Sequence, residues 1–124
     1  MQDNPPPEQI LDIAIAHLRD NVLPTLSGRA VFDMRVTISA LELVCRSIVL
    51  TPGSDAAERQ RLSELLGQDG DLETLNRALC DRIASGALDL QTPGLAAHLR
   101  ATALEKLAVD QPNYSAYRRA RQSQ

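Results

Sequence analysis

The feature that most limits how this chain can fold is the apolar stretch at residues 29–50, RAVFDMRVTISALELVCRSIVL. Apolar side chains recur in it at steps of three and four, which places them along one side of a helix. These are Val31, Met34, Ile38, Leu41, Cys45 and Ile48. A second apolar arc, nearly opposite the first, comprises Phe32, Val36, Leu43 and Leu50. A helix that is apolar on two sides must be covered on two sides, so we expect it at the centre of a bundle or at a subunit interface.

The rest of the chain predicts an all-α fold. With 124 residues the chain suits one domain, and its three aromatic residues leave a core of aliphatic side chains, which favours helix-on-helix packing. We therefore expect a single-domain bundle of about five helices in residues 1–112, around a central helix at 29–50, followed by a short C-terminal tail at 113–124. The other helices are expected at residues 5–21, 54–66, 71–86 and 92–110.

Proline, glycine and small polar residues set the expected boundaries between these helices. Thr51-Pro52-Gly53 is predicted to end the central helix, and Thr92 followed by Pro93 to begin the last one. The short link LPTLSG at 23–28 makes the first two helices an antiparallel pair. Gly86 and Asp110 are the expected ends of the last two helices.

The C-terminal tail combines both tyrosines of the chain with three arginines and no acidic residue. Tyrosine and arginine are enriched at the centres of protein interfaces. Two interpretations stay open for Tyr114, Tyr117, Arg118 and Arg119: they bind a partner, or the rings attach the tail to the bundle while the arginines remain in solvent.

Motifs that carry chemistry are missing from the sequence. His17, His98, Cys45 and Cys80 have none of the spacings typical of a metal site, so we expect no metal and interpret the cysteines as reduced packing residues. No nucleophile elbow, phosphate-binding glycine loop or Ser/His/Asp signature is present. We expect no catalytic residues and no cofactor, and an activity of its own is not favoured.

Charge and hydropathy restrict the compartment and the partners. The formal net charge is −3, which argues against nucleic acid or an anionic membrane as the main partner. The start, MQDNPPPEQ, lacks the features of a signal peptide, and Glu42 and Arg46 interrupt the best candidate for a membrane span. We expect a cytoplasmic protein.

Nearly the whole chain resembles a family of short bacterial proteins of unknown function. The resemblance covers the opening PPPEQILDIAIAHLRDNVLPTLSGRAVFDMRV, the segments GDLETLNRALCDRIASGALDL and LRATALEKLAVDQPNYSAYRRA, and most specifically the tail motif DQPxYSxYRRA. Members of that family are often encoded beside acyl-CoA dehydrogenases and kinases that resemble aminoglycoside phosphotransferases. The resemblance implies a link to acyl-CoA metabolism and supplies no catalytic residues.

These observations lead to one main hypothesis and two alternatives. The main one is a non-catalytic helical accessory protein, itself a homodimer, that binds an acyl-CoA dehydrogenase or a phosphotransferase-like kinase. The second is a small-molecule module in which Arg35, Arg46 or the tail arginines hold a CoA-like phosphate or an acyl carboxylate. The third is an enzyme that is active only in a complex.

Overall fold

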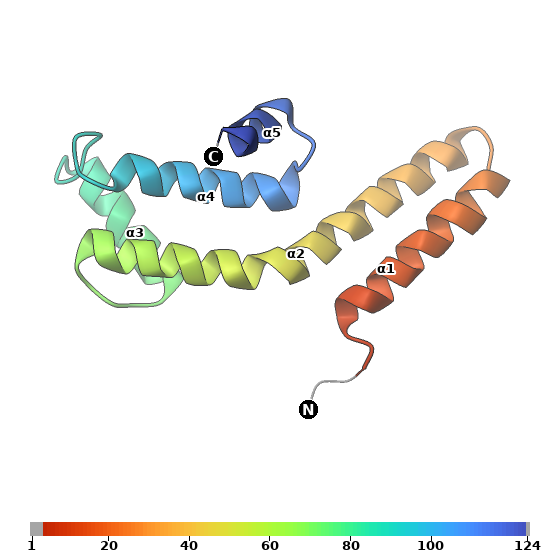
Figure 1. Cartoon of the computed structure of the whole chain (residues 1–124), viewed down its shortest axis with the longest axis horizontal. Helices are drawn as coiled ribbons and strands as arrows, with labels where there is room; N and C mark the ends of the chain where they lie inside the picture. Colours follow the sequence, from red (N-terminus) through yellow and green to blue (C-terminus); the bar gives the residue numbers. More distant parts are fainter. Residues whose placement is uncertain (1–3, 124) are drawn as a thin grey trace. The chain divides into compact units, whose positions relative to one another are not determined.

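The computed structural model describes residues 4–123, and within that range its regular structure is entirely helical (Figure 1). The prediction of an all-α fold with about five helices is confirmed. The α-helices are α1 (Pro7–His17), α2 (Arg29–Leu66), α3 (Leu72–Ala84), α4 (Leu95–Asp110) and α5 (Ser115–Gln122). The chain divides into two compact units, Met1–Leu50 and Thr51–Gln124, so α2 contributes to both.

The N-terminal unit is a hairpin of α1 and the first part of α2, which run side by side in Figure 1. Between them the chain tightens through a π-helical turn (Leu18–Val22) and a 3-10 turn (Leu23–Thr25). Cys45 contacts Asp12 of α1, and Glu42 pairs with Arg19 of the π-helical turn, so residues later in the first arm meet residues earlier in α2. The predicted antiparallel pairing is therefore confirmed.

Helix α2 does not end at Leu50, and this prediction was wrong. It continues through Pro52 to Leu66, joining the two helices expected at 29–50 and 54–66. A proline inside a helix removes one backbone hydrogen bond and costs about 3 kcal/mol. In the C-terminal unit, Leu62 and Leu66 pack into the core, and this packing stabilises the helix on the far side of the proline.

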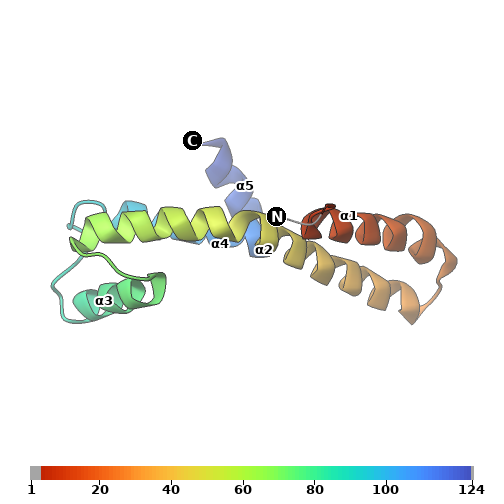
Figure 2. The same cartoon turned by 90° about the horizontal axis from the view of Figure 1, so that it is seen from below.

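The C-terminal unit has a contiguous hydrophobic core. Five leucines that are at most 5 % exposed form it, namely Leu62, Leu66, Leu75, Leu79 and Leu95. Figure 1 shows α4 running alongside the second half of α2, and Figure 2 shows α3 beside the same part of the helix. Polar contacts join these helices too, because Asn76 of α3 donates to the buried carboxylate of Glu58 at 2.8 Å.

Local signals fix most of the helix ends in this unit. The side chain of Asp71 accepts a hydrogen bond from the backbone N–H of Thr74 at 2.7 Å and caps α3, as its position predicted. Gly86 follows that helix with a φ of 77°, the left-handed conformation that glycine adopts at little cost. Helix α4 ends at Asp110 as expected.

The predicted start of α4 at Thr92–Pro93 was wrong. The helix begins at Leu95, after Gly94, whose φ of 90° lies outside the helical range. Thr92 belongs to the preceding turn instead, because its hydroxyl accepts a hydrogen bond from the backbone N–H of Asp89 at 3.0 Å. A threonine that closes a turn is not available to cap the next helix.

By length and composition alone, α2 is also long and apolar enough to cross a membrane. An 18-residue window of it has a mean hydropathy of 1.4, and 11 % of that window is buried. Core helices of soluble proteins meet the same criterion, so the expectation of no membrane partner stays a prediction.

Candidate functional site

The side of α2 that faces away from α1 is an exposed apolar surface, which we call the outer α2 face. It is formed by the exposed Phe32, Val36, Ala40, Leu43 and Leu50 and by Ser47, which is polar and partly buried. Steps of four, four, three, four and three residues keep these positions on one side of the helix. Phe32 is 65 % exposed and Val36 is 52 % exposed, whereas Ile38, on the side toward α1, is 4 % exposed. Of the two apolar arcs, the hairpin covers one.

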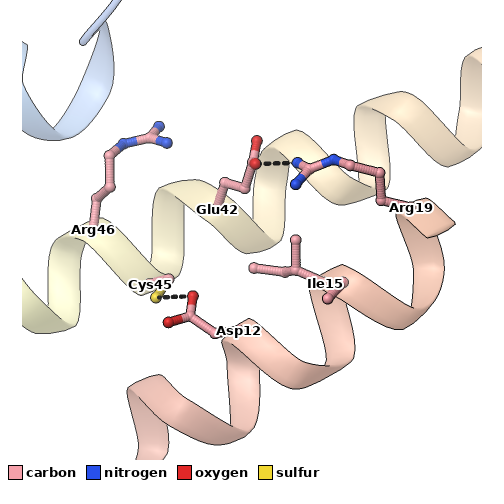
Figure 3. Close-up of a pocket in the computed structure, with 7 residues that line it drawn as sticks. Asp12, Ile15, Arg19, Glu42, Cys45 and Arg46 are labelled. Carbon is pink, nitrogen blue, oxygen red and sulfur yellow. Dashed lines mark hydrogen bonds and ion pairs between the residues drawn. The ribbon is translucent and has the colours of Figure 1, made fainter.

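A pocket of about 290 Å³ lies between the two helices of the hairpin (Figure 3). Its labelled lining residues are Asp12, Ile15, Arg19, Glu42, Cys45 and Arg46. In Figure 3 Arg19 reaches across from the π-helical turn after α1 to Glu42, and the Asp12 carboxylate faces the Cys45 thiol. Two arginines and two carboxylates make the lining balanced in charge, which gives an anionic ligand only a weak electrostatic attraction.

The thiol of Cys45 is held in its protonated form. Its sulfur lies 3.4 Å from the Asp12 carboxylate, to which it donates. Burial, and then this hydrogen bond to a negative group, raise the pKa of Cys45 above its ordinary value. Because the thiolate is the reactive form, the environment disfavours a nucleophilic role and agrees with packing.

The structure separates the two arginines predicted as ligand contacts. Arg46 lines the hairpin pocket, while Arg35 is exposed and is not part of its lining. Arg19, which the sequence did not single out, is the second arginine of the pocket. The short link at residues 23–28 could have indicated this role, because it folds the first two helices into an antiparallel hairpin. Arg19, near the end of the first arm, then lies against the second helix.

The C-terminal unit contains a polar cluster between α2 and α4 that sequence reasoning missed. The guanidinium of Arg61 donates to both carboxylate oxygens of Glu105, at 2.9 and 2.7 Å, and to the hydroxyl of Thr102 at 3.3 Å. The two charged side chains are about a quarter exposed, at 26 % and 25 %. Hydrogen bonding to Glu105 raises the pKa of Arg61 further above its already high ordinary value, so the guanidinium stays charged.

His98 lies beside this pair and is 3 % exposed. Burial, and then the positive charge of Arg61, lower the pKa of His98 below its ordinary value, which keeps the ring neutral at neutral pH. Within residues 4–123, the Nδ1 atom of His98 and the Nε atom of Arg61 have no hydrogen-bond partner. Both residues also line an open pocket of about 520 Å³ at the start of α4. Leu95, His98, Thr102 and Glu105 follow a three-four-three spacing, the signal by which this polar side of α4 could have been found.

The predicted partner-binding residues of the tail lie on and beside α5. Tyr117 is 6 % exposed, and Arg121 stacks over its ring at 5.8 Å from the centroid. Tyr114, by contrast, is 52 % exposed. One ring therefore attaches the tail, and the other is available at the surface with the exposed Arg118 and Arg119. Partner binding by these residues stays a prediction.

No group of three or more His, Cys, Asp or Glu side chains within residues 4–123 is placed to hold a metal ion.

A small all-α protein is the class that this fold defines. The family model for a domain of unknown function, DUF6285, matches residues 24–114, and the chain belongs to this family. The match begins just before α2 and ends at Tyr114, so it includes the outer α2 face and the C-terminal core. Comparisons with curated proteins and with solved structures each found no match.

Proposed function

We propose that the protein is a non-catalytic helical accessory protein that acts in the cytoplasm as a homodimer and binds a partner enzyme of acyl-CoA metabolism. The observation that supports this proposal best is the exposed outer α2 face. Contiguous apolar surface on a small protein is typical of a binding site for another protein. The link to acyl-CoA metabolism rests on the family resemblance of the sequence.

The small core of the hairpin supports the need for a binding partner. Among its described residues only Ile15 and Ile38 are buried apolar side chains. Burial of apolar side chains is the main favourable contribution that offsets the conformational entropy lost on folding. Covering the outer α2 face would bury further apolar area and offset part of that cost.

The first experiment measures the molecular mass in solution by light scattering. We expect twice the chain mass of 13.5 kDa. Leu43→Lys, on the outer α2 face, should give a monomer because it places a charge in the interface. Val49→Lys is the matched control: Val49 is 56 % exposed and lies on another side of the same helix, so this variant should stay dimeric. A monomeric wild-type protein at micromolar concentration would remove the homodimer from the proposal.

The second experiment tests the partner enzyme. The tagged protein should retain a co-expressed acyl-CoA dehydrogenase or phosphotransferase-like kinase during purification. Replacing Tyr114, Arg118 and Arg119 together by alanine should abolish retention without changing the helical circular dichroism, because these side chains are exposed. Retention of neither enzyme would count against the accessory role.

The presence of two arginines in the hairpin pocket favours one alternative, a module for a CoA-like phosphate or an acyl carboxylate. Arg19 and Arg46 supply the positive charge, although Asp12 and Glu42 oppose it. A thioester at 100 times its dissociation constant would stabilise the protein by about 2.7 kcal/mol. Thermal-shift measurements with a series of CoA thioesters test this alternative. If none of the thioesters raises the melting temperature, the alternative is excluded.

A further inference from the structure

We propose that the outer α2 face binds the same face of a second copy with the two α2 helices antiparallel, so that residue i lies opposite residue 83 − i. This inference rests on the proposed homodimer through the outer α2 face and adds the direction and the register of the pairing. It follows from the order of large and small side chains along the outer α2 face.

Apart from Phe32, which lies at the edge of this face, its large and small residues occupy two separate rows. One row repeats every seven residues and carries the large side chains Val36, Leu43 and Leu50, all exposed by 38 % or more. The other row, also with a seven-residue repeat, carries Ala40 and Ser47. In the heptad notation of coiled coils the large residues occupy d positions and the small ones a positions.

The direction of pairing decides which residues meet. In a parallel pair, each layer joins two residues of the same row, so layers of two large side chains alternate with layers of two small ones and leave gaps. In an antiparallel pair, each layer joins one row with the other, and each inner layer then contains one large and one small side chain. Cores pack well when large and small residues alternate across facing positions.

The register follows from the overlap of the two copies. With positions that add up to 83, Leu43 lies opposite Ala40 and Val36 lies opposite Ser47, and each pairing occurs twice because the arrangement is two-fold symmetric. The outermost layer places Leu50 opposite Asp33. Shifting the register by one heptad in either direction moves a layer out of the apolar stretch at residues 29–50.

The charges on this face permit self-association. Asp33, at the edge of the face, is the acidic residue of the two rows, and it pairs with Arg29 one turn earlier at 3.7 Å. Arg35, Glu42 and Arg46 lie on other sides of the helix, so no like charges face each other across the interface. A near-neutral apolar surface that is complementary to itself fits a second copy of the chain.

Disulfide cross-linking tests the register in a background in which Cys45 and Cys80 are replaced by serine. The variant with both Val36→Cys and Ser47→Cys should form a covalent dimer on mild oxidation. Position 36 of one copy faces position 47 of the other, which brings their Cα atoms within disulfide range. Either substitution alone should give little dimer, since two copies of one position lie about 17 Å apart along the axis. Mixing the two single variants should restore the covalent dimer.

A matched control separates the face from chance encounters. Arg35→Cys with Ile48→Cys obeys the same sum of 83 but lies off the outer α2 face, and should not cross-link. Circular dichroism and light scattering of each reduced variant establish that it is helical and give its mass. Strong cross-linking of each single variant with itself would indicate parallel helices and overturn the proposal.

The remaining outcomes distinguish this proposal from the homodimer itself. If the mass is dimeric but the variant with Val36→Cys and Ser47→Cys does not cross-link, the proposed face and register are wrong and the homodimer itself is retained. A monomeric mass would overturn both. A monomer that sediments with phosphatidylcholine vesicles would identify a lipid surface as what covers the outer α2 face.

Discussion

The two units of this protein use aliphatic residues in different ways. In Thr51–Gln124, five leucines contributed by α2, α3 and α4 form a closed core. In Met1–Leu50, two helices are paired, and a pair has only one shared side. Of the thirteen large hydrophobic residues exposed in the described part of the chain, nine lie in the N-terminal unit.

This difference shows that apolar content does not by itself make a core. Three helices around one axis can enclose a leucine on all sides, whereas two helices leave the far side of each open. The C-terminal unit therefore has a buried leucine core of its own. The N-terminal unit contains the more apolar segment, yet most of its large apolar side chains are exposed.

The largest effect is expected from Leu62→Ala. Leu62 is 0 % exposed and lies in the core of the C-terminal unit, so the substitution should lower the free energy of unfolding by about 2–5 kcal/mol. Urea denaturation measures this loss. Leu90→Ala serves as the control, since Leu90 is 75 % exposed and should change stability by less than about 0.5 kcal/mol. Equal losses in the two variants would show that the core assigned here does not hold this unit.

A smaller loss is expected from Arg61→Met, which leaves the partly buried carboxylate of Glu105 without its partner. We expect about 2 kcal/mol, below the cost for a fully buried pair because both side chains are a quarter exposed. Adding Glu105→Leu should recover part of the loss. A double variant whose loss equals the sum of the two single losses would show that the pair is not coupled.

The pH dependence of stability should depend on His98. Its pKa is lower in the folded protein than in the unfolded chain, so the unfolded state binds the proton more tightly. Stability should thus fall as the pH is lowered through about 6.5, by at most about 1.4 kcal/mol per pH unit. Urea denaturation at pH 7.5 and 5.5 should show a smaller decrease in His98→Gln than in the wild type, and His17→Gln, at an exposed position, should behave as the wild type.

The smallest effect should come from Arg19→Ala in the N-terminal unit. The ion pair with Glu42 has side chains that are 49 % and 36 % exposed, and such pairs contribute less than about 1 kcal/mol. Chemical denaturation at low and at high salt would measure the loss of unfolding free energy in Arg19→Ala and, for comparison, in Arg61→Met. If Arg19→Ala lost as much stability as Arg61→Met, polar contacts would contribute equally in the two units, and the contrast between them would be limited to apolar packing.

Much of the fold follows from local sequence, and the exceptions have a physical cause. The helix ends at Gly86 and Asp110 were predictable because a glycine with positive φ and a following proline act on their own neighbours. The end expected at Thr51-Pro52-Gly53 was wrong, because α2 continues through Pro52 to Leu66. The local preference of this motif therefore does not decide where the helix ends.

The candidate sites divide in the same way. The outer α2 face was visible in the sequence, since a helical repeat specifies a face without reference to the rest of the chain. The Arg61–Glu105 pair was not, because its residues are 44 positions apart and meet only once α4 packs on α2. The same applies to His98, whose burial depends on that packing rather than on its neighbours in sequence.

The positions of the aromatic residues have a consequence for spectroscopy. The chain has no tryptophan, and both tyrosines, Tyr114 and Tyr117, belong to the C-terminal unit. Tyrosine fluorescence therefore reports on that unit alone, whereas the far-ultraviolet signal sums over all helices. Thermal melts followed by the two signals would coincide for cooperative unfolding and separate if the hairpin melts first.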